Sequence, residues 1–364
     1  MEYIRLSDCA DYSDLRTKSI DLDTYISTEN MLPNKGGIFQ ADSIPDVKTT
    51  SKYEVNDILL SNIRPYFCKI WFANREGGCS NDVLVIKAKE NYLPKFLYYV
   101  LSDQNFFNYD TVTSKGTKMP RGTPNAIMKY LVPDIGKDKQ EKIVKGLSTY
   151  DSLIENNNKR IKILEQMAEN LYKEWFVRFR FPGHETTPIE NGIPKGWHIE
   201  KLSSVFEVKY GKDHKNIDDG TIPIFGSGGV MRYGNKALYS GETVLIPRKG
   251  SLNNVMYFNG DFWTVDTMFY TKMKISHCAK YAFFTLSKVD LEGLNSGASI
   301  PSMTTDILYH LKMVVPDKNT LIAFDKQIDI LFSEKQLLQK NNDNLIKQRD
   351  LLLPRLMSGK LEAR

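Results

Sequence analysis

Apolar residues recur with a period of about 3.5 residues in two long segments of the sequence. Between Gln140 and Phe176 they alternate in steps of four and three, and one position of the series is polar. A second, less regular series starts at Leu321 and has asparagine near its middle, at Asn341 and Asn342. This spacing predicts two long helices, each with an apolar seam that must be covered. The predicted seam residues are Ile143, Leu147, Ile154, Asn157, Ile161 and Leu164 in the first helix and Leu331, Leu338, Asn341 and Leu345 in the second.

Each predicted helix follows a block of about 135 residues, and the two blocks carry short motifs in the same order. The strand-like run before Arg64 returns before Arg248, and the run that begins at Lys69 returns at Asn254. Six such matches keep an offset between about 181 and 185 residues, which indicates an internal duplication of a globular module plus a helix. We therefore predict a first module at 1–135, a central spacer helix at 136–181, a second module at 182–315 and a C-terminal spacer helix at 316–364.

The two modules are expected to mix strands and helices. Short β-branched and aromatic runs at Asp57–Ser61, Lys69–Ala73 and Val83–Ile86 predict strands in the first module. Because each buried Leu or Ile side chain contributes about 1.5–3 kcal/mol, each long helix should cover the other's seam. We expect an α+β fold in which two tandem α/β modules are joined by an intramolecular antiparallel coiled coil with approximate two-fold symmetry. The asparagines of the two seams either pair and fix the register or form a solvated weak point.

The composition is that of an ordinary soluble protein, with 41% hydrophobic and 26% charged residues among 364. No charged-then-apolar leader opens the sequence, and no apolar run approaches the ~18 residues of a membrane span, so we expect a cytoplasmic protein. The four cysteines form no C-x-x-C pair, which argues against a disulfide framework and a zinc site. A net charge of +5 permits nucleic-acid binding without requiring it.

Motifs for self-contained catalysis are missing. The sequence has no G-x-x-x-x-G-K-[ST] phosphate loop, no H-x-x-x-H pair among its five histidines and no Asn/Asp-Pro-Pro-aromatic methyltransferase tetrapeptide. The glycine-rich segment 226–229 lacks the strand-to-helix context of a dinucleotide fingerprint, and we interpret it as a plain turn. The sequence therefore predicts a non-catalytic chain with no metal site.

Basic residues with aromatic neighbours on predicted loops are the remaining candidates for function. Arg and Lys bind phosphates or guanine edges and Asn binds adenine, so this mixture suits recognition of double-stranded DNA. Any single one of these residues could simply be solvated, but their equivalent positions in the two modules favour binding. Asp82 and Asp266 could cap strands or accept from cytosine, and we favour the structural role. The candidates are Asn62, Arg64, Tyr66, Lys69, Lys115, Lys118 and Arg121 in the first module and Tyr210, Lys212, Arg248, Lys249, Ser251, Ser296 and Ser299 in the second.

Several segments together resemble the specificity subunits of type I restriction–modification enzymes. The segment from Tyr25 to Pro33, the one from Asn56 to Pro65 and the one from Cys79 to Ile86 look like a target-recognition domain of that family. The helix from Lys139 to Phe176 resembles its spacer helix. Gly192–Trp197 resembles the entry to a second recognition domain, and Leu351–Gly359 resembles the C-terminal helix ending. The resemblance covers essentially the whole chain.

This resemblance implies a DNA-recognition subunit of a restriction system. Each recognition domain would read one half of a bipartite asymmetric site, while the helices would set the spacing and dock two methyltransferase (modification) subunits. Restriction and translocase subunits would complete the complex. The chain itself would hold no cofactor. S-adenosylmethionine, ATP and Mg would act in the partner subunits, where adenine N6 is methylated and DNA is cut. One departure is that the second module lacks the dense Lys and Arg of the loop around Lys115–Arg121.

Two other interpretations stay open at the level of sequence. A stand-alone two-headed DNA-binding regulator would have the same duplication but would need no partner subunits. A nuclease with an unrecognised site would cleave DNA by itself in the presence of a metal, although its usual motifs are absent.

Overall fold

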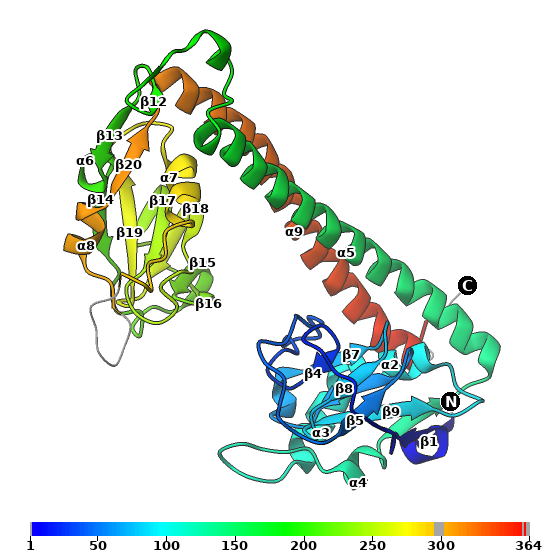
Figure 1. The fold of residues 1–364 in the computed structure, drawn as a ribbon. Coiled ribbons are helices and arrows are strands. Elements are labelled where there is room, and N and C mark those ends of the chain that lie inside the picture. The colour runs from blue at the N-terminus through cyan, green and yellow to red at the C-terminus, as the bar shows by residue number, and fades with distance from the viewer. Residues whose placement is uncertain (1, 295–301, 359, 362–364) are drawn as a thin grey trace. The chain divides into compact units, whose positions relative to one another are not determined.

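A computed structural model describes residues 2–294, 302–358 and 360–361. The chain divides into two compact units (Figure 1). The first unit combines Met1–Asn158 with Lys340–Arg364, and the second unit is Lys159–Gln339. The boundary cuts both long helices, α5 (Lys137–Tyr172) and α9 (Lys318–Met357), so that each unit contains one globular module and one stretch of each helix.

The first module contains two four-stranded sheets and one strand pair. The strands predicted from β-branched runs are confirmed as β6 (Ile58–Ser61), β7 (Ile70–Phe72) and β9 (Val83–Ala88). They form one sheet with β2 (Ala10–Tyr12), in the order β2-β9-β6-β7. The other sheet has the order β3-β5-β8-β4, with bounds Arg16–Thr17, Thr50–Tyr53, Gly77–Cys79 and Tyr25–Ile26. β1 (Glu2–Arg5) pairs antiparallel with β10 (Leu131–Asp134).

The first module also has helices, which pack together with the sheet β2-β9-β6-β7 and with the long helices of the first unit. These helices are α1 (Leu6–Cys9), α2 (Pro94–Ser102), α3 (Gln104–Thr113) and α4 (Pro124–Ile127). Phe96 and Phe106 are fully buried in one apolar cluster with Ile143 and Leu147 of α5 and Leu356 of α9. Both spacer helices therefore share the core of this module.

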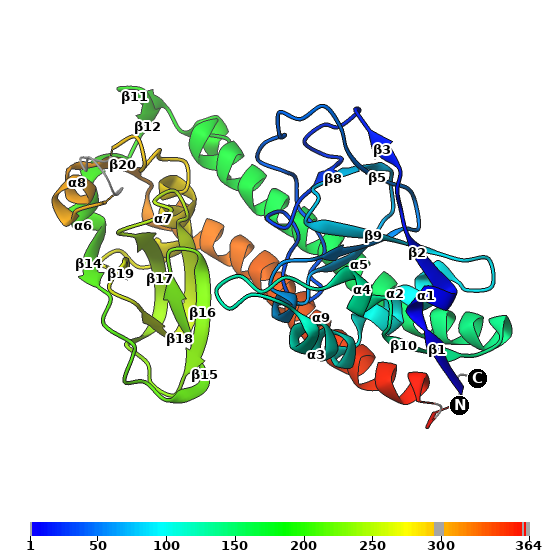
Figure 2. The same ribbon diagram turned by 90° about the horizontal axis from the view of Figure 1, so that it is seen from below.

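The second module is built on a six-stranded sheet in the order β14-β19-β17-β18-β15-β16 (Figure 2). Its strands are Phe206–Tyr210, Met268–Met273, Tyr239–Pro247, Met256–Thr264, Asp219–Gly226 and Gly229–Gly234, respectively. β13 (His198–Lys201) pairs with β20 (Lys312–Val315), as β1 pairs with β10 in the first module. The helices are α6 (Leu202–Val205), α7 (Ala279–Leu286) and α8 (Thr305–His310). A two-residue pair, β11 (Ile189–Glu190) and β12 (Ile193–Pro194), precedes the module.

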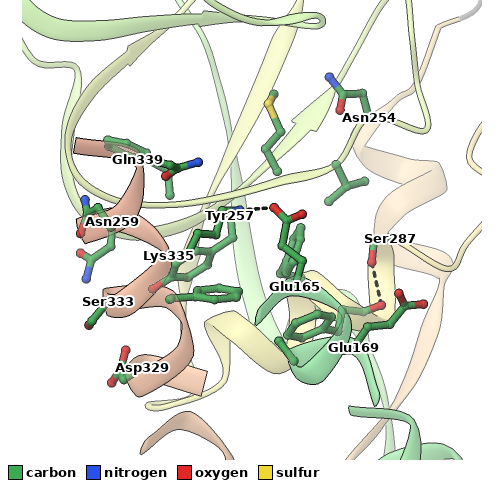
Figure 3. Close-up of a pocket in the computed structure, with 18 of the residues that line it drawn as sticks. Glu165, Glu169, Asn254, Tyr257, Asn259, Ser287, Asp329, Ser333, Lys335 and Gln339 are labelled. Atoms are coloured by element: carbon green, nitrogen blue, oxygen red, sulfur yellow. Dashed lines mark hydrogen bonds and ion pairs between the residues drawn. The ribbon is translucent and has the colours of Figure 1, made fainter. Parts of the chain in front are cut away.

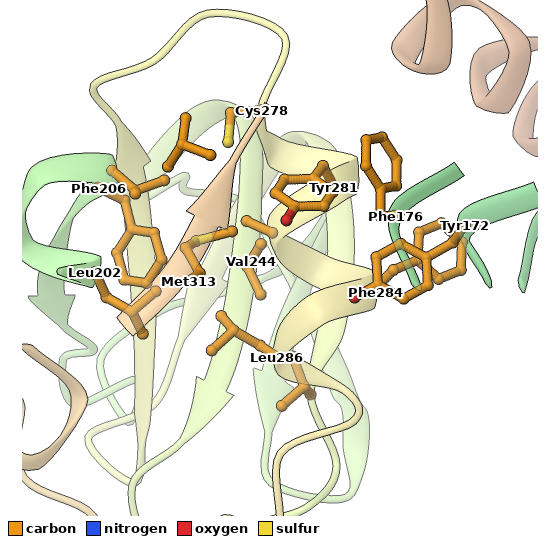
Figure 4. Close-up of a cluster of buried hydrophobic side chains, with 14 of the residues drawn as sticks. Tyr172, Phe176, Leu202, Phe206, Val244, Cys278, Tyr281, Phe284, Leu286 and Met313 are labelled. Atoms are coloured by element: carbon orange, nitrogen blue, oxygen red, sulfur yellow. The ribbon is translucent and has the colours of Figure 1, made fainter. Parts of the chain in front are cut away.

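Aromatic rings join the end of α5 to the core of the second module. Figure 4 shows Tyr172 and Phe176 beside Tyr281 and Phe284 of α7. The ring centroids of Phe176 and Tyr281 are 4.4 Å apart, and those of Tyr172 and Phe284 are 5.5 Å apart. A π-helical turn, Lys173–Val177, ends the helix and directs Phe176 toward these rings.

In both units α5 and α9 run antiparallel. In the first unit Asp151 contacts Arg349, and Asn157, further along α5, contacts Asn342, earlier in α9. In the second unit the ring of Trp175 lies 5.9 Å from that of Phe324, beyond the ion pair of Glu165 with Lys335. Together with the two α/β modules, this helix pair confirms the expected α+β fold class.

The predicted seam residues differ in burial along the two long helices. Of the predicted set, Ile143, Leu147 and Leu338 are buried, whereas Ile154, Ile161, Leu164, Leu331 and Leu345 are half-buried. Asn157 donates its amide to Asn342 at 2.9 Å, and Asn342 donates to Asn158 at 2.8 Å. Asn341 was predicted for the seam but is exposed, because its neighbour occupies the inward position. Of the two interpretations of these asparagines, the hydrogen-bonded pair is the one observed. No helix of the described residues is long and apolar enough to span a membrane.

Candidate nucleic-acid interface

A basic turn follows β6 in the first module. Arg64 has φ of 51° and begins a short 3-10 helix, Pro65–Phe67, so that the chain reverses sharply there. The guanidinium carbon of Arg64 lies 5.9 Å from the centre of the Phe67 ring, and Tyr66 is 49% exposed. An arginine in cation–π contact with a ring at a solvent-facing turn is held in place yet keeps hydrogen-bond donors for a ligand.

The loop Lys115–Arg121 lies against this basic turn. Its ends exchange two backbone hydrogen bonds of 2.9 Å, and Pro120 accepts a bond of 2.8 Å from the amide of Arg64. Lys115, Lys118 and Arg121 are all exposed. Arg121 forms an ion pair with Asp82 at 3.0 Å, so Asp82 orients this arginine. Four basic residues thus gather at one end of the first module.

Lys69 does not join this exposed group. Its ammonium donates to the carbonyl oxygen of Thr28 at 2.6 Å, and burial lowers the pKa of the amine. Asn62 also faces inward in part, because its side-chain oxygen is buried and has no hydrogen-bond partner among the described residues.

The equivalent turn of the second module carries Arg248, Lys249 and Ser251. The guanidinium carbon of Arg248 lies 5.4 Å from the centre of the Tyr210 ring, and Tyr210 is 51% exposed. Lys249 and Ser251 are exposed. Lys212 is also exposed. Its backbone amide donates to the carbonyl oxygen of Thr264 at 2.9 Å, three residues before Thr267, whose carbonyl oxygen accepts from the amide of Arg248.

Both turns have backbone links to the segment that follows the glycine loop, but in the second module these links lie two residues further along the turn than the alignment of Arg64 with Arg248 gives. In the first module the amide of Gly122 donates to Asn62 at 3.0 Å, and in the second the amide of Met303 donates to Arg248 at 2.9 Å. Lys249 also forms a bridge with Ser302, as Ile63 does with Arg121. The same kind of link is thus present at the candidate site of both modules, in a shifted register. Ser296 and Ser299 lie outside the described residues.

A buried carboxyl lies beneath the first basic turn and was not found from the sequence. Asp110 of α3 is fully buried, and neither of its oxygens has a hydrogen-bond partner among the described residues. Burial raises its pKa to about 7. A Cβ added at Gly122 would lie 2.6 Å from Asp110 Oδ1 and 2.8 Å from Asn62 Oδ1, so the two oxygens flank this glycine. Only the tertiary fold brings these residues together.

A pocket of about 710 Å³ in the second unit lies between the long helices, β18 and α7 (Figure 3). Its apolar lining includes Tyr257, Phe283 and Phe332. The charged residues of its lining are paired: Glu165 with Lys335, Glu169 with Lys288 and Asp329 with Lys280. Charges that neutralise one another in this way do not supply a nucleophile with a matching base. Among the described residues no cluster of His, Cys, Asp and Glu could hold a metal ion.

Two stretches of the sequence, residues 13–166 and 194–348, match the family model described as the type I restriction modification DNA specificity domain. The chain belongs to this family. Each stretch covers most of one module and part of the long helix that follows it. The two matches correspond to the internal duplication, and family membership confirms the resemblance seen in the sequence motifs.

Two relatives in the family are specificity subunits, and this chain aligns with most of the length of each. The MjaIX specificity subunit of Methanocaldococcus jannaschii is 24% identical over 75% of this chain and 70% of its own. The MjaVIII specificity subunit of the same organism is 22% identical over 100% of this chain and 93% of its own. The crystal structure of a type I S subunit from M. genitalium has a TM-score of 0.55 at 16% identity and covers 98% of this chain and 96% of that one, which shows the shared fold.

Family membership decides against one of the two other interpretations left open by the sequence, the nuclease. The chain is a non-catalytic specificity subunit of a type I restriction–modification system, and not an enzyme itself. The rival interpretation as a nuclease is therefore set aside.

Proposed function

We propose that each module reads one half of a bipartite asymmetric DNA site. The observation that carries this proposal is the matched placement of Arg64 beside Phe67 and Arg248 beside Tyr210, at equivalent turns of the two modules. Arginine donates two hydrogen bonds to a guanine edge or to a phosphate, and an exposed ring can contact a base or sugar. Twin sites on a duplicated chain suit a DNA site with two separate halves.

The exposed basic residues would contact DNA in different ways. Lys115, Lys118, Lys212 and Lys249 suit phosphate contacts, since each is an exposed ammonium on a flexible stem. Arg64, Arg121, Arg248, Tyr66, Tyr210 and Ser251 could reach base edges. We propose that Lys69 and Asn62 support the basic turn. We propose that the functional parts of the chain are the first module at 1–135, the central spacer helix at 136–181, the second module at 182–315 and the C-terminal spacer helix at 316–364.

We also propose that the long helices set the distance between half-sites and dock two methyltransferase subunits. Apolar side chains on their outer faces support the docking role: in the second unit Ile163 and Met167 of α5 are 54% and 50% exposed, and Ile330 of α9 is 59% exposed. Ile163 and Met167 are four residues apart and so neighbours on one face of α5, and adjoining exposed apolar side chains favour a protein partner. S-adenosylmethionine, ATP and Mg would then be bound by the methyltransferase and restriction subunits.

Mapping methylated adenines in DNA exposed to the full complex tests the recognition role. We expect one split sequence with two specified halves. A chain that binds specific DNA while ignoring methyltransferase subunits in co-purification would favour a stand-alone regulator instead. Insertion of a whole helical repeat near Lys159 should change the preferred spacing between half-sites, and an unchanged spacing would refute the ruler role.

A further inference from the structure

Both modules contain a short parallel strand pair that ends in a turn. In the first, β4 pairs with β8, with Ile26 opposite Cys79. In the second, β15 pairs with β18, with Phe225 opposite Thr264. The chain then enters the turn 27–30 in the first module and the turn 226–229 in the second. These two turns are topologically equivalent, although the sequence repeat does not align them.

An equivalent side chain holds each turn beside the basic turn of its module. Lys69 donates to the carbonyl oxygen of Thr28 at 2.6 Å, and Asn254 donates to that of Ser227 at 2.7 Å. The repeat aligns Lys69 with Asn254. In the second module the contact is close, because a Cβ on Gly250 would lie 2.8 Å from the Ser227 hydroxyl. The turn 226–229 therefore lies against the Arg248–Ser251 segment.

The second module's turn has open space around it. A Cβ added to Gly228 would meet no atom of the described chain within 4 Å, and its φ is not in the left-handed region. Glycine permits close approach of a ligand to the main chain. In the following strand, β16, Val230 is 46% exposed and Met231 is 58% exposed. Next to these residues the pairing of β16 with β15 shifts register, between Ile224 and Phe225. Such irregularities often redirect side chains at binding sites.

The first module's turn has a different chemistry. Two of its amides are already used, since the amide of Ser27 donates to the side-chain oxygen of Asn30 at 2.6 Å and the amide of Glu29 donates to the Ser27 hydroxyl at 3.2 Å. The side chain of Glu29 is exposed, and its carboxylate would repel a phosphate. The exposed lysines of the Lys115–Arg121 loop supply positive charge instead.

We propose that the turn 226–229 is a DNA-contacting element of the second module, over which the sugar–phosphate backbone passes close to Gly228 beside Arg248 and Lys249. This inference rests on the proposed function. It explains how the second module binds DNA with fewer basic loop residues, because a bare glycine turn lets the phosphates come near the two charges that it has. The segment that the sequence suggested was a plain turn becomes part of the interface.

The test measures affinity of the full chain for a 30-base-pair duplex, taken as the probe, by fluorescence anisotropy at fixed salt. Gly228→Ala should weaken binding about fivefold and Gly228→Asp more, by a similar factor for duplexes of different sequence, as a backbone contact requires. The matched control is Gly146→Ala in α5, where a Cβ also meets no atom of the described chain within 4 Å. It should leave affinity unchanged. Thermal unfolding of each variant verifies that the fold is intact.

The outcomes separate this inference from the proposed function. If Arg248→Ala weakens binding while both Gly228 variants bind like the wild type, the turn is no contact and the proposed function stands. If the loss in the Gly228 variants depends on the DNA sequence, the turn meets base edges and the backbone assignment is wrong. If the unaltered chain and its complex bind no duplex DNA, the proposed function fails and this inference fails with it.

Discussion

The two modules place a lysine at the same position but surround it differently. Lys95 of α2 and Lys280 of α7 are aligned by the repeat. Lys95 lies 4.5 Å from the centre of the Phe72 ring, and Lys280 lies 5.5 Å from that of Tyr257. Each ammonium also contacts a carboxylate of the long helix that follows its module. The duplication has thus preserved a connection between module and spacer helix.

The surroundings of the two lysines explain why their pKa values shift in opposite directions. Lys95 has one ion pair, to Asp151 at 3.4 Å, and burial lowers the pKa of Lys95 despite that carboxylate. Burial also disfavours the charged form of Lys280, but hydrogen bonds with Asp325, Asp329 and Glu242 raise its pKa. In the first unit Asp151 of α5 gains a second cation, Arg349 of α9, at 2.8 Å. The comparison teaches that the number of partners, and not burial alone, decides whether a buried charge is stable.

The largest expected effect is at Lys280. Lys280→Met would leave three carboxylates without their common cation, and Lys280 is only 1% exposed, so we expect a loss of about 3–5 kcal/mol in unfolding free energy. Lys95→Met should cost less, because Arg349 still neutralises Asp151. Urea unfolding of both variants measures the difference, with the exposed Lys326→Ala of α9 as control. Equal losses in the two modules would break the comparison.

Buried carboxyls offer a second contrast, between unpaired Asp110 and paired Asp325. The pKa of Asp110 is raised to about 7 in the folded protein, above a value near 4 in the unfolded chain. The folded protein therefore binds the proton of this carboxyl group more tightly than the unfolded chain does. Stability from this group is complete below about pH 4 and is lost as pH rises through about 7. Asp110→Asn should therefore stabilise the protein at pH 8, by roughly 2–4 kcal/mol, and have little effect at pH 4.

Unfolding of Asp110→Asn and wild type at a series of pH values measures this effect. The matched comparison is Asp325→Asn, which removes the charge of a paired carboxylate and should destabilise the protein at pH 8. A wild-type profile that matches that of Asp110→Asn would show that Asp110 has a donor after all.

The basic turns should separate the modules functionally. Arg64→Ala and Arg248→Ala should each weaken binding to one half-site by about 1–3 kcal/mol and leave recognition of the other half intact. Affinities for duplexes with one half-site altered at a time measure this, once the site is known from methylation mapping. A loss shared equally between the halves would contradict the assignment of one module to one half.

The smallest expected effect lies in the helix pair of the first unit. Asn157→Ala removes the donor to Asn342, which is 7% exposed, and should destabilise by about 1 kcal/mol. The control is Asn341→Ala, one residue away from Asn342 and exposed, which should change stability little. Thermal unfolding compares the two. Similar losses would mean that Asn341 and Asn342 share the seam.

By itself the sequence determined the parts of this protein that depend on local periodicity and on repetition. The 3.5-residue pattern predicted both long helices and most of the seam, and the repeated motifs predicted two α/β modules with matched basic turns. These features are readable because helical spacing and strand-like runs are properties of neighbouring residues.

The tertiary structure decided everything that depends on residues distant in the chain. A helical period cannot choose between adjacent Asn341 and Asn342, which differ by only about 100° around the helix, and packing selected Asn342. Lys69 was expected to face a ligand, yet the fold supplies the Thr28 carbonyl as its partner. Lys280 gathers its carboxylates from β17 and α9, and no spacing in the sequence marks such a cluster. A buried charge must find its partners in space, so only the folded chain reveals them.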